Sequence, residues 1–260
     1  VAALAGHADR AARLAREAAT PVEWIVRLPV AIRSPASSLE VYAALGAPVD
    51  SMVAIEALVE AALENRLPPD NRPLVRSILL SRAASLAYPA HTLGSFAELA
   101  ERAGYPVLRA QAAHARGDTA EALQTLTDNR RARQRSNLRR AEISYDAIYP
   151  EARLWAELGD TATAVVVLDG TLNTLRWSEP GSLADVARAA SLVRAMAFRA
   201  ELAASTGDAS TARRWATAVA ALWARADEPL QPVVRRMERI NAAGGVPNSA
   251  TPSPLDGGNR

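Results

Sequence analysis

A glycine followed by an aspartate recurs three times where one helical pattern ends and another begins, and an alanine stands four residues after each aspartate. The three copies are Gly117, Asp118 and Ala122; Gly159, Asp160 and Ala164; and Gly207, Asp208 and Ala212. Glycine adopts the left-handed backbone conformation without a Cβ penalty, so it is the usual residue at a helix exit. The aspartate is placed to cap the next helix through its side-chain oxygen, an interaction of about 1 kcal/mol relative to alanine. Each copy therefore predicts a helix, a tight turn and a second helix.

The spacing of these corners predicts an array of helix hairpins. The glycines are separated by 42 and 48 residues, which is enough for two helices and two turns. We expect paired helices at about 106–116 and 118–134, 138–158 and 160–176, and 181–206 and 208–226, and a capping helix at about 229–241. Pro150 should kink or restart its helix without abolishing it. The alanine after each corner indicates that the two helices approach closely, so a large residue there should cost roughly 1–3 kcal/mol.

The segment from Gly117 to Leu123, Gly-Asp-Thr-Ala-Glu-Ala-Leu, resembles the centre of a tetratricopeptide repeat, where a Gly-Asp turn precedes an aromatic and then a small residue. Thr119, Thr161 and Ala209 stand where that aromatic is usual, and the period exceeds the roughly 34 residues typical of the repeat. The resemblance covers about residues 105–240 and is that of a degenerate member. It implies an all-α fold of antiparallel hairpins stacked into a right-handed superhelix, an α-solenoid, whose concave face holds a peptide or helix of a protein partner.

A second, looser likeness lies in the last unit. The segment from Thr211 to Arg235 is similar to repeat regions attached to bacterial signalling kinases and transcriptional activators. It implies an alternative role, a sensor or ligand-binding region of such a kinase or activator.

The chain divides into three regions by composition and pattern. Residues 1–104 form an N-terminal helical region with proline-rich connections, and residues 105–241 form the repeat array with its capping helix. Residues 242–260 are rich in glycine, proline and serine, so they cannot bury a core and should form a flexible tail.

The absence of two residue types excludes several chemistries. All thirty basic residues are arginine, which a GC-rich genome explains, and no lysine is available for a phosphate loop, a Schiff base or a kinase-type ATP site. There is no cysteine, which removes disulfides, thiolate nucleophiles and cysteine-ligated metals. The net charge of +2 does not demand an anionic partner.

The sequence leaves the location of the protein open. The longest uncharged run in the folded part, residues 83–97, is too short and polar to span a bilayer, so we expect no transmembrane segment. The chain starts at Val1 without a signal-peptide pattern, so we expect a mature or excised piece of something longer. The bacterial periplasm and cytoplasm both fit, including a site peripheral to a membrane complex.

No motif points to catalysis. His7, His91 and His114 are isolated, with no pair at metal-ligand spacing, so each is expected at the surface or in a cap. There is no Gly-x-Ser-x-Gly elbow, no glycine-rich phosphate loop and no zinc-protease helix. Carboxylates are scattered among arginines, as on solvated helix faces. We therefore expect a protein that is not an enzyme, with no catalytic, cofactor-binding or metal-binding residues.

Large apolar residues in the array are expected in the core. The stripe at Trp215, Val219, Leu222 and Trp223 falls on one helical face, which favours packing against Leu192, Met196 and the last helix over an aromatic ligand box. Trp155 is expected to fill the space between neighbouring hairpins.

The one conspicuous charged cluster has six arginines in eleven residues. Its members are Arg130, Arg131, Arg133, Arg135, Arg139 and Arg140. At 100° per residue they spread around a helix, which favours a solvated connection between helices. An acidic protein surface or anionic lipid headgroups are the alternative, and nucleic acid is the least favoured because no aromatics interleave.

The sequence as a whole predicts a binding function. The hairpin array and the missing chemistry favour a non-catalytic scaffold or assembly subunit of a bacterial multi-protein complex, with the arginine cluster and the tail adding contacts.

Overall fold

The computed structural model describes residues 105–135, 145–173 and 186–243, together with His7, residues 43–44 and scattered residues between 57 and 79. Within this described part every regular element is a helix and no strand occurs. The elements are η2 (Pro69–Asn71), α6 (Pro106–Ala115), α7 (Thr119–Arg135), α8 (Tyr145–Glu157), α9 (Thr161–Leu172), α10 (Val186–Ser205), α11 (Ala209–Leu222), η6 (Glu228–Leu230) and α12 (Gln231–Ala243). The prediction of an all-α fold is confirmed.

The three corners have the geometry that their sequence predicts. The glycines have φ angles of 84°, 89° and 79°. Each aspartate N–H donates to the carbonyl five residues earlier at 2.9 Å, and each glycine N–H donates to the carbonyl three residues earlier. This pair of bonds is a Schellman helix end. Each aspartate carboxylate then accepts the backbone N–H three residues later, at 2.9, 2.8 and 3.0 Å, and so caps the next helix.

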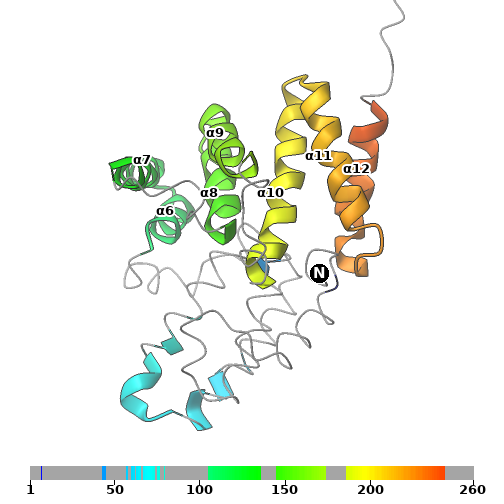
Figure 1. Cartoon of the computed structure of the whole chain (residues 1–260). Coiled ribbons are helices and arrows are strands. Elements are labelled where there is room, and N and C mark those ends of the chain that lie inside the picture. The colour runs from blue at the N-terminus through cyan, green and yellow to red at the C-terminus, as the bar shows by residue number, and fades with distance from the viewer. Residues whose placement is uncertain are drawn as a thin grey trace, which may run out of the picture.

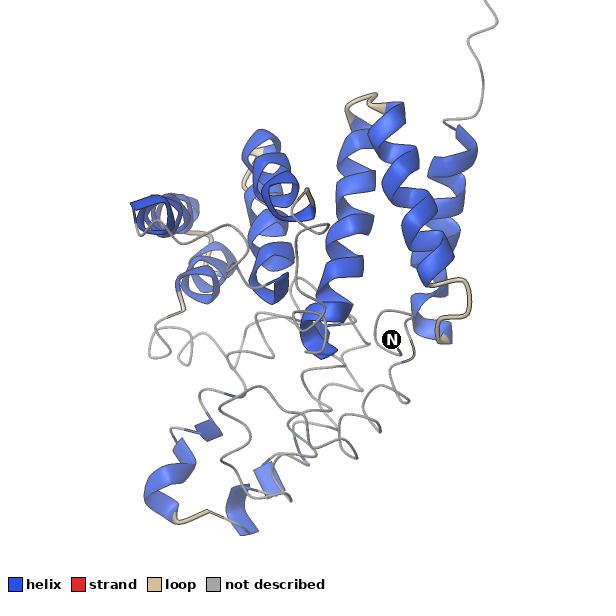
Figure 2. Ribbon diagram, in the orientation of Figure 1, coloured by secondary structure: helices blue, strands red, loops and turns tan. Residues whose placement is uncertain are grey.

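The helices pack as three antiparallel pairs followed by α12. Figure 1 shows α6 with α7, α8 with α9 and α10 with α11, in chain order across the view, and Figure 2 shows the helices and the corners that join them. The alanines Ala122, Ala164 and Ala212 are buried, as close approach within each hairpin requires. Neighbouring hairpins meet mainly through their first helices, because α8 packs against both α6 and α10.

Several helix limits differ from the predicted ones for local reasons. Helix α9 ends at Leu172, after Gly170, and α11 ends at Leu222 instead of 226. Pro229 lies in the short helix η6, so α12 starts at Gln231 and continues to Ala243. Pro150 does not abolish helix α8, as predicted, but the helix runs through the proline from Tyr145 to Glu157 and does not restart there. Residues 138–144, 174–176 and 181–185 of the predicted helices lie outside the described residues.

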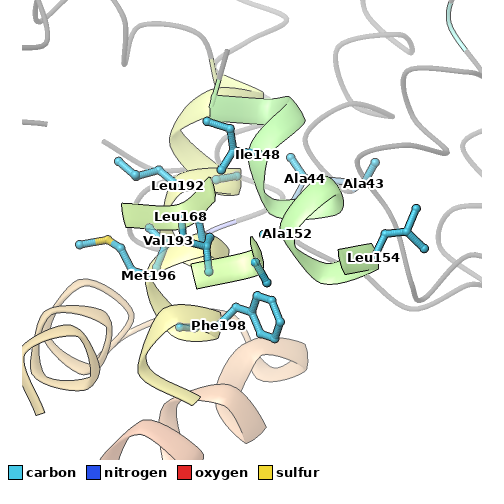
Figure 3. Close-up of a cluster of buried hydrophobic side chains, with 14 of the residues drawn as sticks. Ala43, Ala44, Ile148, Ala152, Leu154, Leu168, Leu192, Val193, Met196 and Phe198 are labelled. Carbon is cyan, nitrogen blue, oxygen red and sulfur yellow. The ribbon is translucent and has the colours of Figure 1, made fainter. Parts of the chain in front are cut away.

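Helix α10 lies at the centre of the described core. It contacts α8, α9, α11 and α12, and each residue from 189 to 200 is buried. Figure 3 shows apolar side chains of α8, α9 and α10 meeting there, among them Ile148, Leu168 and Val193. Burying a leucine of this kind contributes about 1.5–3 kcal/mol. A helix buried around its whole circumference has no face open to solvent or to a partner along that stretch.

The predicted stripe on α11 is right in three of its four members. Trp215, Val219 and Trp223 are buried, whereas Leu222 is 37% exposed. The helix ends at Leu222, and Trp223 leaves the helical path with φ −102° and ψ 13°. Trp223 is buried although it has left the helix, whereas Leu222, the last residue of the helix, stays at the edge of the core.

Described residues from the first hundred positions contact the array. Ala43, Ala44, Leu63 and Leu79 belong to the same cluster of buried apolar side chains as the hairpins. Arg194 on α10 donates to the carbonyl of Ala43 at 3.0 Å. The predicted flexible tail lies, from residue 244 on, outside the described residues, whereas residues 242 and 243 belong to α12.

Candidate functional site

A polar groove of about 460 Å³ lies between α7 and the hairpin of α8 and α9. Helix α7 lines it with Leu123, Thr127, Arg130, Arg131 and Gln134. These residues follow one another at intervals of four, three, one and three, which places them on one face of the helix. The other side consists of Trp155 from α8, Asp160 from the second corner and Thr163 from the first turn of α9.

The hairpin geometry explains why a groove forms here. The first helices α6 and α8 pack against each other, whereas α7 and α9 are second helices of neighbouring hairpins and lack comparable packing. Long polar side chains of α7 bridge the space instead. Arg130 donates to the hydroxyl of Thr163 at 3.3 Å, and Arg133 donates to Oε1 of Glu151.

Glu151 is the one fully buried carboxylate among the described residues. Burial raises the pKa of Glu151, because a carboxylate loses its hydration in the protein interior. The charge of Arg133 and its hydrogen bond oppose this rise, and Arg130 and the nearby indole N–H of Trp155 oppose it to a lesser extent. The second carboxylate oxygen, Oε2, has no hydrogen-bond partner among the described residues.

The structure divides the predicted arginine cluster into separate roles. Arg130 and Arg131 line the groove, and the side chain of Arg131 is 64% exposed and 3.7 Å from Asp128. Arg133 instead turns inward to Glu151, and Arg135 is exposed without lining the groove. Arg139 and Arg140 lie outside the described residues.

The corner aspartates Asp160 and Asp208 act mainly as helix caps. The carboxylate of Asp160 lines the groove but accepts the N–H of Thr163 at 2.8 Å, so it is engaged as a helix cap. In the third corner, the hydroxyl and the N–H of Thr211 hold the pKa of Asp208 below its ordinary value. None of the other eight corner residues lines this groove.

Sequence reasoning missed Glu151 as a buried residue, although a signal was present. Ile148, Ala152 and Trp155 mark the buried face of α8, and Glu151 stands three residues after the first of them. A carboxylate at that position has to be paired, and the nearest arginine-rich helix supplies Arg133. Trp155 itself is 4% exposed and faces the groove beside α7, which confirms its predicted burial between neighbouring hairpins.

A second set of buried arginines joins the second and third hairpins. Arg194 stacks over the ring of Tyr149 at 4.0 Å, and that ring meets Phe198 edge to face at 6.1 Å. Arg199 forms a two-pronged ion pair with Asp169, at 2.7 and 3.1 Å. These contacts hold α8, α9 and α10 together, and every arginine involved has its partner within the chain.

The described histidines stand apart from one another. His7 lies 3.2 Å from Asp227, at the connection between α11 and α12, and His114 is half-buried at the end of α6. His91 lies outside the described residues. No three histidine, aspartate or glutamate side chains gather to hold a metal in the described part, and no helix there is long and apolar enough to cross a membrane.

The groove therefore offers two guanidinium groups, two hydroxyls and an amide, against one carboxylate that already serves as a cap. Such a set can hold an anionic group by charge and hydrogen bonds.

Compared with protein families, curated proteins and solved structures, the chain matches none of them.

Proposed function

We propose that this protein is a non-catalytic scaffold or assembly subunit of a bacterial multi-protein complex, which binds a protein partner through its helix hairpins. Its hairpins would stack as a degenerate tetratricopeptide-like array. Three corners with the same hydrogen bonds support the repeat character of the array.

The observation that carries this proposal is the groove between α7 and the hairpin of α8 and α9. Its lining comes from two successive hairpins, so it exists only because these two hairpins lie next to each other. Its side chains are suited to hold polar groups of a ligand, and the guanidinium of Arg131 faces solvent.

The burial of α10 bears on where a partner would bind. Residues 189–200 are buried on every side of that helix, so a peptide cannot lie along them. We therefore assign the partner surface to the α7 side of the array, and not to a face along α10.

Isolation of the tagged full chain from the cells that naturally express it tests this function. Native mass spectrometry should find the chain in a complex with a second protein at a fixed ratio. A matched sample prepared at high salt should lose that partner if it binds through the arginine-lined surface. A chain that is monomeric at native concentration and low salt would contradict the proposal.

A further inference from the structure

We propose that the groove between α7 and the α8–α9 hairpin binds carboxylate side chains of an acidic peptide segment in the protein partner. The proposal rests on the proposed function, because it names the chemistry of the partner that the array would bind. Arg130 and Arg131 would contact the carboxylates, and the residues nearer the start of α7 would contact an apolar side chain of the same segment.

Neither arginine of the groove is strongly paired among the described residues. Arg130 forms no ion pair with a described carboxylate, and it donates instead to the neutral hydroxyl of Thr163 at 3.3 Å. Arg131 lies 3.7 Å from Asp128, and both side chains of that pair are more than half exposed. Exposed pairs of this kind are weak, so an incoming carboxylate can displace Asp128.

In the described part of the chain, the wall beneath the arginines holds no carboxylate that is free to neutralise them. Trp155 lines the groove, and its buried indole N–H lies near the carboxylate of Glu151, whose pKa it lowers. Glu151 itself is bound to Arg133 and attracts Arg130 only to a lesser extent.

The side chains that α7 contributes to the groove change from apolar to charged along the helix. Leu123 stands at one end of the lined face, Thr127 follows it, and the arginines and Gln134 stand at the other end. The distance from Leu123 to Gln134 along the helix axis is about 16 Å. This order matches a segment with an apolar residue at one end and acidic residues one or two helical turns away.

Two other anionic partners fit the surface less well. A lipid surface requires apolar side chains that insert together. The exposed large apolar residues of the described part, Tyr105, Val166 and Leu222, lie apart in the chain, before α6, on α9 and at the end of α11. A single-stranded nucleic acid requires exposed aromatic rings for stacking, and Trp155 is almost fully buried. The acidic peptide remains the partner that the groove favours.

Fluorescence anisotropy with the full chain tests the proposal. The probe is a short fluorescein-labelled peptide of leucine and glutamate residues, and its control is the same peptide with glutamine in place of glutamate. We expect saturable binding of the glutamate peptide only. Arg130→Gln and Arg131→Gln should each weaken it about 10-fold, the loss expected for one charge-assisted contact.

Arg135→Gln is the matched control, because it removes the same charge from the same helix outside the groove. It should change the affinity less than about twofold, since screening limits the reach of an exposed charge. Circular dichroism of each variant should keep the helical spectrum. Absence of binding by the parent protein would overturn the proposal, and so would an Arg135→Gln effect as large as that of Arg131→Gln.

Binding measurements with other ligands, and isolation of the chain from cells, separate the proposal from its alternatives. Inorganic phosphate or vesicles containing phosphatidylglycerol that bind more tightly than the peptide would overturn it in favour of a phosphate or lipid site. If the peptide fails but the chain is isolated with a protein partner at a fixed ratio, the groove proposal is wrong and the proposed function stands. If the peptide binds but the chain is isolated alone, the groove proposal stands and the proposed function is wrong.

Discussion

Replacing Arg133 and replacing Glu151, the two members of one ion pair, should lower the stability of the folded protein by different amounts. Glu151 is fully buried, whereas the side chain of Arg133 is about a quarter exposed. Arg133→Gln leaves a buried carboxylate without its main counter-charge. Glu151→Gln leaves an arginine that can still reach water and that has further interactions within the chain. Arg133→Gln should therefore destabilise the protein more than Glu151→Gln.

The magnitude follows from what remains around the carboxylate. An unpaired buried charge of this kind costs about 3–5 kcal/mol. Arg130 still attracts Glu151 in the variant, so we expect the lower end, about 3 kcal/mol. Glutamine and arginine have similar helix propensities, so α7 itself is unaffected. Glu151→Gln should cost about 1–2 kcal/mol, the effect of one lost hydrogen bond in a buried setting.

The loss of stability in Arg133→Gln should also depend on pH. Burial raises the pKa of Glu151 in the folded protein above the ordinary value of 4.5. An acid with a raised folded pKa favours folding below its unfolded pKa, and this contribution is lost as the pH rises through the folded pKa. Removing Arg133 raises the folded pKa further. The deficit of Arg133→Gln should therefore be largest near neutral pH and should shrink as the pH falls toward the ordinary value.

Urea denaturation followed by circular dichroism measures these differences. Near neutral pH, about 3 kcal/mol corresponds to a midpoint lower by roughly 1–3 M urea. The double variant, with both residues changed to glutamine, should be about 2 kcal/mol more stable than Arg133→Gln alone, because it has no buried charge to compensate. The reasoning is refuted if Arg133→Gln is as stable as Glu151→Gln, or if its deficit grows on acidification.

Three further predictions concern the corners and helix α9. Gly159→Ala should destabilise the protein by about 1–2 kcal/mol, because a left-handed backbone disfavours a Cβ atom. Gly170→Ala should instead stabilise α9 by about 0.5–1 kcal/mol, because a Cβ there meets open space. The midpoint temperature of thermal unfolding should fall for Gly159→Ala and rise for Gly170→Ala. Asp118→Ala should lose about 1 kcal/mol in urea denaturation while Asp118→Asn keeps most of the stability, and equal losses would argue against a cap. Ala164→Leu should cost about 1–3 kcal/mol by overpacking. The exposed control Ala162→Leu should stay within about 0.5 kcal/mol of the parent, and a similar loss in both variants would exclude overpacking as the cause.

The corners were predictable from the sequence because their physics is local. A glycine exit and an aspartate cap act through backbone atoms within five residues, so Gly117 and Asp118 determine their own geometry. The helix pairs followed from these corners. Leu222 was predicted wrongly because helical periodicity shows which residues share a face, but not whether neighbouring elements cover that face at the end of the helix.

The candidate groove depends on contacts that no local pattern contains. Arg130 and Arg133 look alike in the sequence, yet one lines the groove and the other binds a buried carboxylate. Their roles differ because Arg130 lies opposite Thr163 of α9, whereas Arg133 lies opposite the buried Glu151 of α8. The burial of α10 is also nonlocal, since residues as distant as Ala43 contact it. Predicting the partner surface from the sequence was therefore possible only as far as the arginine cluster.

Each corner aspartate serves two helices at once, and this limits how the chain can change its length. The N–H of Asp160 closes α8 while its carboxylate opens α9, so no spare residue separates the two helices. If one residue were inserted, the N–H that closes α8 and the carboxylate that caps α9 would belong to different residues. The insertion would also turn the second helix by about 100° about its axis. Ala164 would then leave the interface with α8. Insertions and deletions at the corners should therefore prevent the two helices of the hairpin from packing, even where single substitutions are tolerated.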